Sequence, residues 1–305
     1  MADKKLGIYF LMLLVPLFWG SAFGITKHVL SELPPLTISA IRFIPAGLLM
    51  ALWAVWRGEW DAAPLRKNWL GLTVLGASGV LGYNFFFATG MQYTSAINGA
   101  LVVVINPVGT ALISVLLLGE FGSVRLLCGV LLSLAGVLTV ITRGDWTALQ
   151  NLSFNYGEIL LLGAVASWIL YTTLIKVVMR RVKPLMATTL STLIGAGLLF
   201  LASLTEPGWA KLGSVSLQTA FELVYLALFP SFFAFLLFNL GVKEIGASKA
   251  SSYINLMPVN AVLIAALFYG ESVTGVQLAG MTLVMSGVLL TTRAPAGKLQ
   301  HKSPE

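Results

Sequence analysis

Between residues 217 and 240 the chain reads LQTAFELVYLALFPSFFAFLLFNL, and Glu222 is the single charged residue of this stretch. A helix rises 1.5 Å per residue, so about 20 apolar residues cross a hydrocarbon layer about 30 Å thick. The stretch therefore predicts a transmembrane helix.

Apolar runs of this kind fill most of the chain. Of its 305 residues, 57% are hydrophobic and 10% are charged, against about 45–50% and about 25% in soluble domains. We expect ten membrane-spanning helices, at residues 7–30, 36–56, 68–90, 94–118, 123–142, 156–179, 185–205, 217–240, 246–269 and 272–292. The connections are too short for a soluble domain, so the predicted fold class is an all-α membrane protein that acts in the bilayer or at its surfaces.

Basic residues are divided unevenly between the two sides that these helices define. With the N-terminus inside, 15 of the 19 Lys and Arg residues fall on the inner side and 4 on the outer side. Loops rich in Lys and Arg stay in the cytoplasm. We therefore expect a multi-pass protein of a bacterial-type cytoplasmic (inner) membrane with both termini inside. The net charge of +7 then reflects topology and does not indicate nucleic acid as a partner.

The two halves of the chain resemble each other at a nearly constant offset. Trp19 and Lys27 match Trp168 and Lys176 at an offset of 149 residues. At 151 residues the matches include Gly90 with Gly241, Pro107 with Pro258, Gly129 with Gly280, and Gly136 with Gly287. We expect a first repeat over residues 1–143, a second over 150–293 and a cytoplasmic tail over 294–305.

Each predicted repeat holds five helices, which is an odd number. The second copy must therefore run inverted, related to the first by a pseudo-two-fold axis in the membrane plane. Inverted repeats offer two alternative packings, each open to one side, so alternating access is the expected mechanism.

A substrate site is expected near the midplane, between the repeats. Trp19 and Trp168 fall near the centres of their helices, where ring faces suit apolar groups or an ammonium group; packing against neighbouring helices is the alternative. Mid-span polar residues are further candidates, with hydrogen bonding between helices as their alternative role. They are Tyr83, Asn84, Asn98, Asn106, Tyr171, Ser231, Tyr253 and Asn255. Pro107, Pro230 and Pro258 each predict a kink.

Three basic residues complete the candidate set. Lys27 and Lys176 lie toward opposite mouths, where each either guards the entrance or extends to the interface. Arg42 lies deeper in its span, where no predicted span offers an acidic partner. Central Asp, Glu or His residues and a GxxxxGK[ST] loop are missing from the sequence, so we expect facilitated diffusion without proton coupling or ATP.

Other classes of protein fit the sequence less well. The spans offer no HExxH motif and no carboxylate pair, and the single cysteine, Cys128, lies in an apolar run. We therefore expect no enzyme, no catalytic residue, no metal and no cofactor. A scaffold that uses its glycine faces for helix packing is the remaining alternative, and saturable flux would separate it from a transporter.

Several short motifs resemble those of one family. They are Trp19-Gly20-Ser21-Ala22-Phe23, Lys27, Pro34-Pro35-Leu36, Ile41-Arg42-Phe43, Tyr93-Thr94-Ser95-Ala96, Asn106-Pro107-Val108, Gly119-Glu120, Gly129 and Gly136. The pattern is similar to an EamA domain of the drug/metabolite transporter (DMT) superfamily. The second half repeats it more loosely, with Ser167-Trp168 for Trp19-Gly20 and no Arg matching Arg42.

The resemblance covers nearly the whole chain. Within the superfamily, the chain is most similar to the aromatic amino-acid exporters. It implies a ten-helix carrier that exports small amphipathic metabolites, chiefly aromatic or other neutral amino acids. A carrier for nucleosides, sugars or drugs, or a proton-coupled exporter, is the alternative. The expected partners are a small-molecule substrate and the lipid bilayer, and the sequence does not indicate an oligomeric state.

Overall fold

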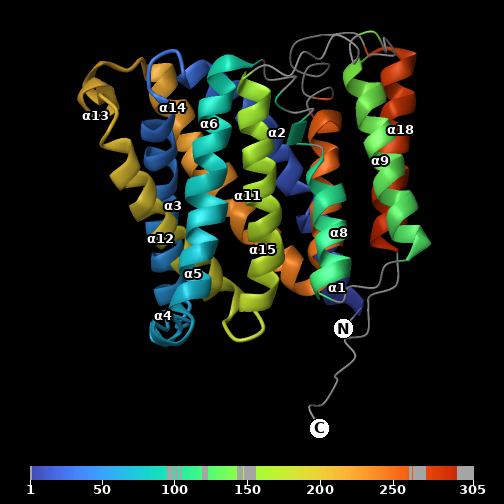
Figure 1. Ribbon diagram of the computed structural model, residues 1–305, viewed down its shortest axis with the longest axis horizontal. Helices are drawn as coiled ribbons and strands as arrows, with labels where there is room; N and C mark the ends of the chain where they lie inside the picture. The colour runs from blue at the N-terminus through green and yellow to red at the C-terminus, as the bar shows by residue number, and fades with distance from the viewer. Residues whose placement is uncertain are drawn as a thin grey trace.

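The computed structural model describes residues 2–94, 99, 102–103, 105–118, 123–142, 147, 156–260, 263 and 273–293. Within these ranges the regular secondary structure is entirely helical. The long helices stand side by side, with the short α4 at one end of the bundle and α13 at the other (Figure 1).

The first half contains α1 (Ala2–Leu11), α2 (Leu14–Val29), α3 (Pro35–Trp56), α4 (Ala63–Lys67), α5 (Trp69–Leu75), η1 (Gly76–Gly82), α6 (Tyr83–Tyr93), α8 (Asn106–Leu118) and α9 (Val124–Thr142). The second half contains α11 (Tyr156–Val178), α12 (Pro184–Ser203), α13 (Gly208–Lys211), η2 (Leu212–Ser214), α14 (Leu217–Leu226), η3 (Ala227–Phe233), α15 (Ala234–Ile245), α16 (Ala247–Ser252), η4 (Tyr253–Leu256) and α18 (Gly275–Thr292).

Seven stretches of the described residues are long and apolar enough to cross a membrane: Gly7–Val29, Pro35–Trp56, Trp69–Tyr93, Tyr156–Val178, Pro184–Ser203, Leu217–Ile245 and Gly275–Thr292. Two shorter apolar helices cover Asn106–Leu117 and Val124–Val140. The expected spans 94–118 and 246–269 lie partly outside the described residues, so the count of ten stays a prediction. Large apolar side chains such as Trp56, Leu117 and Leu217 are exposed on the surface of the bundle, as lipid-facing positions require.

Local sequence signals fix where several helices begin. Pro35 and Pro184 occupy the first turns of α3 and α12, where a missing N–H costs nothing. Thr274 and Gln277 form a capping box at the start of α18. Gly246 ends α15 at a φ of 95°, a conformation that favours glycine.

Two spans contain a π-helical segment at equivalent positions. The segments η1 and η3 begin at Gly76 and Ala227 and end at Gly82 and Phe233, so both ends are 151 residues apart. In η3, Pro230 has no N–H, and the Ser231 hydroxyl donates to the Leu226 carbonyl at 2.9 Å. The expected kink at Pro230 is therefore a wider helical turn whose free carbonyl a side chain satisfies.

Close packing of small residues joins α9 to α18. The two helices lie side by side at one edge of the bundle (Figure 1). A Cβ added to Gly129 would lie 2.8 Å from the Gly287 carbonyl oxygen, and one added to Gly136 would lie 2.7 Å from the Gly280 carbonyl oxygen. Only glycine permits this approach of the two backbones.

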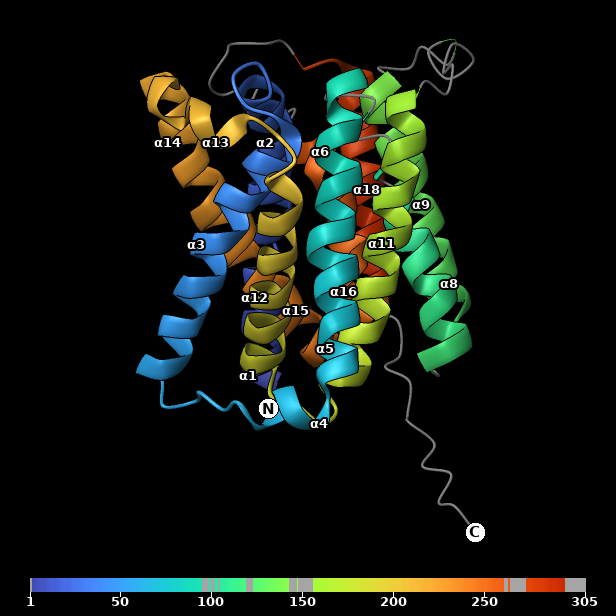
Figure 2. The same cartoon turned by 60° about the vertical axis from the view of Figure 1, so that its left-hand side comes forward.

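The remaining helices enclose the centre of the molecule. α3 packs along α12, and α6 packs along α11, so each contact joins one half of the chain to the other (Figure 2). The main buried apolar cluster extends across both halves, from Met12 and Met50 to Tyr171 and Phe238.

Candidate functional site

An internal cavity lies where helices of the two halves meet. Its lining residues are Trp19, Ala22, Phe23, Arg42, Phe43, Gly79, Tyr83, Asn84, Phe87, Val103, Asn106, Trp168, Pro230, Phe235, Ile254 and Met257. The cavity volume is about 40 Å³, which is room for a few water molecules at about 10–15 Å³ each.

Seven aromatic residues contribute to the cavity wall. The Trp19 and Trp168 rings meet edge to face, with centroids 5.1 Å apart and an interplanar angle of 89°. Tyr83 lies 5.1 Å from Trp168, and Phe87 stacks on Tyr83 at 5.6 Å. The tryptophan pair predicted near the midplane is thus brought together, in a wall suited to flat or branched apolar groups.

The two indole N–H groups differ in their partners. Trp19 Nε1 donates to the Pro230 carbonyl in η3 at 3.0 Å. Trp168 is 4% exposed, and its Nε1 has no acceptor among the described residues. At the repeat offset of 151, Gly79 is the equivalent of Pro230. The bond equivalent to that of Trp19 would therefore run from Trp168 Nε1 to the Gly79 carbonyl, and it is not formed. A buried N–H without an acceptor is costly, and this one belongs to a side chain that lines the cavity.

Arg42 brings a positive charge to the same cavity. It lies on α3 and is 6% exposed, and its Nε has no hydrogen-bond partner in the described part of the chain. Its guanidinium carbon lies 5.7 Å from the centre of the Phe43 ring. The described part of the chain provides no carboxylate for it, since the ion pairs found there are His28–Glu222 and Arg57–Glu59. An arginine side chain keeps its charge in proteins, so the cavity carries a cation that no described carboxylate compensates.

Two asparagines also line the cavity. Asn84 Nδ2 donates to the Val80 carbonyl of the same helix at 2.8 Å. Asn106, at the start of α8, is 1% exposed, and neither its side-chain oxygen nor its side-chain nitrogen has a partner among the residues that the structure describes. Its amide therefore offers both an acceptor and two donors to a bound molecule.

Four of the predicted mid-span polar residues lie outside this lining. Asn239 Nδ2 donates to the Tyr171 hydroxyl at 2.6 Å, and Asn255 Nδ2 donates to the Ser133 hydroxyl at 2.6 Å. The Tyr253 hydroxyl donates to the Tyr9 carbonyl at 3.3 Å, and Ser231 bonds the Leu226 carbonyl. The contacts of Tyr171, Asn255 and Tyr253 correspond to the alternative role, hydrogen bonding between helices, whereas the bond of Ser231 stays within its own helix. The remaining mid-span candidate, Asn98, lies outside the described residues.

Lys27 and Lys176 occupy the last turns of α2 and α11. Lys27 Nζ donates to the carbonyls of Met91 at 2.7 Å and Thr94 at 2.9 Å, at the C-terminal end of α6. A cation there satisfies carbonyls that the helix leaves open and interacts favourably with its dipole. A guarding role for either lysine stays a prediction.

Several lining residues escape a search for polar groups, because they are apolar. Phe235, Ile254 and Met257 are examples, and the repeat is the signal that identifies them. At an offset of 151 they pair with Asn84, Val103 and Asn106, all of which line the same cavity.

These features define a class: a multi-pass helical membrane protein with a buried cavity, lined by aromatic residues, between its two halves. The sequence matches the EamA-like transporter family over residues 6–142 and again over 155–293. The chain therefore belongs to the EamA-like transporter family of the DMT superfamily, and it is a membrane transporter.

Relatives along the whole chain agree with this assignment. An uncharacterized transporter of Bacillus subtilis (strain 168), YyaM, is 32% identical, over 94% of this chain and 93% of its own. An uncharacterized transporter of Archaeoglobus fulgidus is 28% identical, over 93% of this chain and 96% of its own. One solved crystal structure has a similar fold, with a TM-score of 0.76 and 20% identity over 94% of this chain and 97% of its own.

Proposed function

We propose that the protein exports small amphipathic metabolites, chiefly aromatic or other neutral amino acids, through the cavity between its halves. The cavity carries the proposal, because it combines an aromatic wall with polar groups that lack partners. The wall suits an apolar side chain, and the polar groups suit the charged end of such a substrate.

Alternating access between two inverted five-helix repeats is the mechanism that we propose. The glycine contacts of α9 and α18 support it: the offset of 151 turns Gly129 into Gly280 and Gly136 into Gly287, so each observed contact maps onto the other. A two-fold axis between antiparallel copies produces this reciprocity. The equal spacing of η1 and η3, and of the paired lining residues, supports the same axis.

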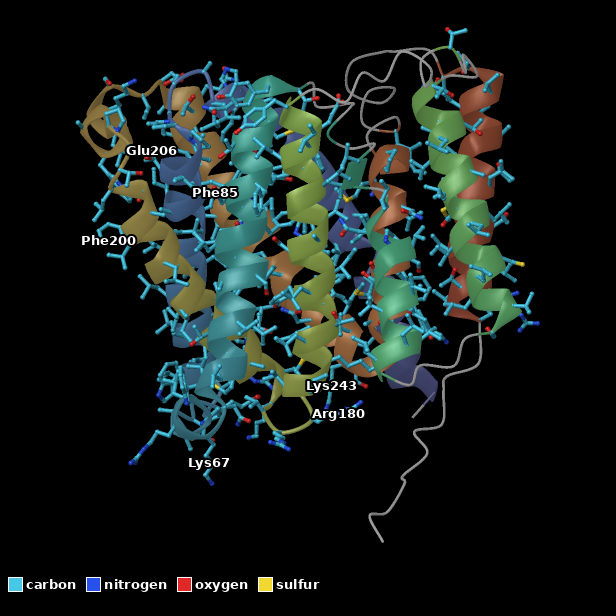
Figure 3. The ribbon with its side chains drawn as sticks, viewed as in Figure 1. Lys67, Phe85, Arg180, Phe200, Glu206 and Lys243 are labelled. Atoms are coloured by element: carbon cyan, nitrogen blue, oxygen red, sulfur yellow. The ribbon has the colours of Figure 1, made fainter. Side chains whose placement is uncertain are left out.

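The orientation that we propose places both termini in the cytoplasm. Lys67, Arg180 and Lys243 lie at one end of the bundle, and Glu206 lies at the other (Figure 3). α1 begins at the basic end (Figure 1). The positive-inside rule assigns that end to the cytoplasm.

Transport down the substrate gradient, without proton coupling, is part of the proposal. Among the residues that the structure describes, those that line the cavity include no Asp, Glu or His, and proton relays in carriers usually depend on such groups.

A counterflow assay in proteoliposomes tests the function. Liposomes preloaded with unlabelled amino acids, sugars or nucleosides would be supplied with the labelled compound. We expect saturable counterflow for amino acids with apolar side chains. Saturable flux of sugars or nucleosides alone would overturn the substrate class, and flux without saturation would overturn the carrier mechanism.

Tryptophan variants test the cavity itself. Trp19→Ala and Trp168→Ala should each lower flux about tenfold or more at equal folded protein, because each removes a central ring contact. Trp56→Ala is the matched control, since Trp56 is 74% exposed at the end of α3. Equal flux in all three variants would remove the tryptophan pair from the site.

A further inference from the structure

The described residues that line the cavity carry a net positive charge. Arg42 supplies one fixed positive charge, and the described residues of the lining include no acidic side chain to balance it. A buried charge without a partner is strongly unfavourable. A ligand with one negative charge would bring the cavity to neutrality, whereas a zwitterion would leave the charge of Arg42 in excess.

The unpartnered donors of the cavity are those that a carboxylate requires. The guanidinium of Arg42, the N–H of Trp168 Nε1 and the amide of Asn106 all belong to lining residues, and each has a buried atom with no partner among the described residues. A carboxylate accepts several hydrogen bonds, and a planar guanidinium matches its two oxygens. An ammonium group meets no carboxylate in this lining and would have only ring faces and the Asn106 oxygen.

We infer that the preferred substrates are amphipathic monocarboxylates of net charge −1, whose carboxylate binds at Arg42, Trp168 and Asn106. This inference rests on the proposed export of small amphipathic metabolites, and it departs from that proposal in making monocarboxylates, and not neutral amino acids, the preferred members of that class. Zwitterionic amino acids with the same apolar group are weaker substrates, and amines are excluded.

The charge of the preferred substrate determines how the membrane potential acts on transport. The loaded carrier is neutral at its cavity, while the empty carrier keeps the charge of Arg42 there. Net export of the anion moves one negative charge outward, so an inside-negative potential drives it. One charge across about 60 mV corresponds to a tenfold concentration ratio.

Three compounds with one ring system separate the possibilities: phenylpyruvate (anion), phenylalanine (zwitterion) and 2-phenylethylamine (cation). With the full chain in proteoliposomes, we expect a kcat/KM for phenylpyruvate about tenfold or more above that for phenylalanine, since one charge-assisted bond is at stake. The amine should neither be carried nor compete. Protein-free liposomes correct for passive leak.

Arg42→Gln tests the anchor. We expect it to remove most of the preference for phenylpyruvate, by about 10- to 100-fold in kcat/KM, while Arg42→Lys keeps part of it. Arg57→Gln is the matched control, because Arg57 pairs with Glu59 at the molecular surface. Thermal unfolding of each variant separates loss of binding from loss of folding. If Arg42→Gln folds and keeps the preference, the assignment of the carboxylate to Arg42 is wrong.

A potassium diffusion potential set with valinomycin tests the charge movement. Net efflux of phenylpyruvate should accelerate when the interior is negative, whereas exchange, in which the carrier never crosses empty, should respond much less. Equal net efflux with and without the potential would contradict charge-moving transport.

Saturable transport in which phenylalanine is favoured would overturn this inference and leave the proposed function standing, whereas no saturable flux of any compound would overturn both.

Discussion

At the scale of the residue, Lys27 illustrates how a charge near a membrane mouth is used. Its amine bonds the Met91 and Thr94 carbonyls, where α6 ends. We predict that Lys27→Met lowers the free energy of unfolding by about 1 kcal/mol, because these carbonyls lose a cationic donor. Thermal unfolding in detergent should then show a Tm lower by about 2 °C.

The arginine variant and the flux assay separate this structural role from a guarding role. Lys27→Arg keeps a cationic donor and should unfold near the wild-type temperature. Flux normalised to folded protein should be similar in all three proteins. A stable Lys27→Met protein that no longer transports would instead assign Lys27 to the entrance.

The same scale shows how far mid-span residues can be predicted from sequence. Depth alone predicts that Trp19 and Trp168 lie near the midplane, and the structure brings their rings together. Depth does not tell which way a side chain points, because successive helical positions turn by about 100°. Asn255 therefore bonds Ser133 instead of lining the cavity. Phe235 carries no polar signal, and only its pairing with Asn84 through the repeat would have identified it.

At the scale of the element, the α9 and α18 pair depends on glycine at fixed positions. A Cβ on Gly136 would lie 2.6 Å from the Val284 backbone nitrogen and 2.7 Å from the Gly280 carbonyl oxygen. Backbone atoms cannot yield as a flexible side chain does, so the helices must separate. We predict that Gly136→Ala lowers the free energy of unfolding by about 1–3 kcal/mol, measured by thermal or denaturant unfolding in detergent.

Gly197→Ala is the matched control for this substitution. Gly197 also lies inside a helix, α12, but nothing lies within 4 Å of an added Cβ. Alanine is the better helix former there by about 0.5–1 kcal/mol, so this variant should be as stable as the wild type or more so. A similar loss in both variants would show that contact with α18 is not its cause, because helix propensity favours alanine at both positions.

The sequence predicts the packing faces of these helices, but it does not predict which helices meet or where a helix becomes π-helical. The constant spacing of Gly129, Gly136, Gly280 and Gly287 indicates packing faces, but it does not say which helices meet. The π-helical form of η1 and η3 is not predictable from Pro230 or Gly79 alone. In η3, the Leu226 and Pro230 carbonyls are satisfied by Ser231 of the same segment and by Trp19 of a distant helix.

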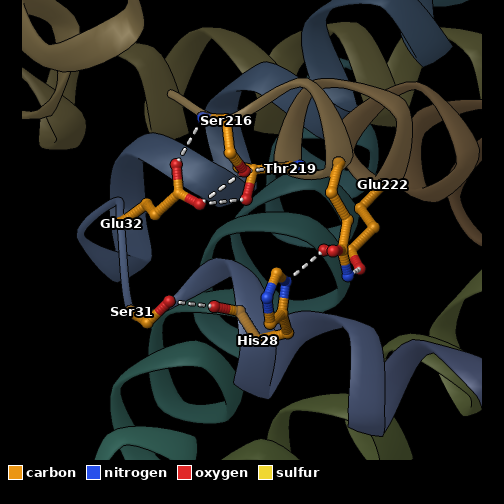
Figure 4. Close-up of polar contacts among 7 residues, drawn as sticks. His28, Ser31, Glu32, Ser216, Thr219 and Glu222 are labelled. Atoms are coloured by element: carbon orange, nitrogen blue, oxygen red, sulfur yellow. Dashed lines mark hydrogen bonds and ion pairs between the residues drawn. The ribbon is translucent and has the colours of Figure 1, made fainter. Parts of the chain in front are cut away.

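At the scale of the whole molecule, carboxylates tie the two halves together at one end. Glu32 of the first half accepts hydrogen bonds from Ser216 and Thr219 of the second, at 2.6–2.8 Å, and an ion pair joins His28 to Glu222 nearby (Figure 4). Glu206 of the second half accepts from the backbone N–H groups of Leu36 and Thr37, at the start of α3. If the proposed mechanism holds, these bonds must break whenever this end opens.

The contact of Glu32 with Ser216 and Thr219 should weaken at acid pH. Hydrogen bonds from Ser216 and Thr219 hold the pKa of Glu32 below its ordinary value, which is about 4.3. The stabilisation is thus complete above that ordinary value and is lost as the pH falls through the lower pKa of the folded protein.

We expect Glu32→Gln to have a lower Tm than the wild type at pH 7, and the difference in Tm to close below about pH 4. Adding Thr219→Val, which removes one donor, should shrink the gap at pH 7. A gap that stays constant from pH 7 to pH 3 would show that the charge of Glu32 does not stabilise the contact between the halves.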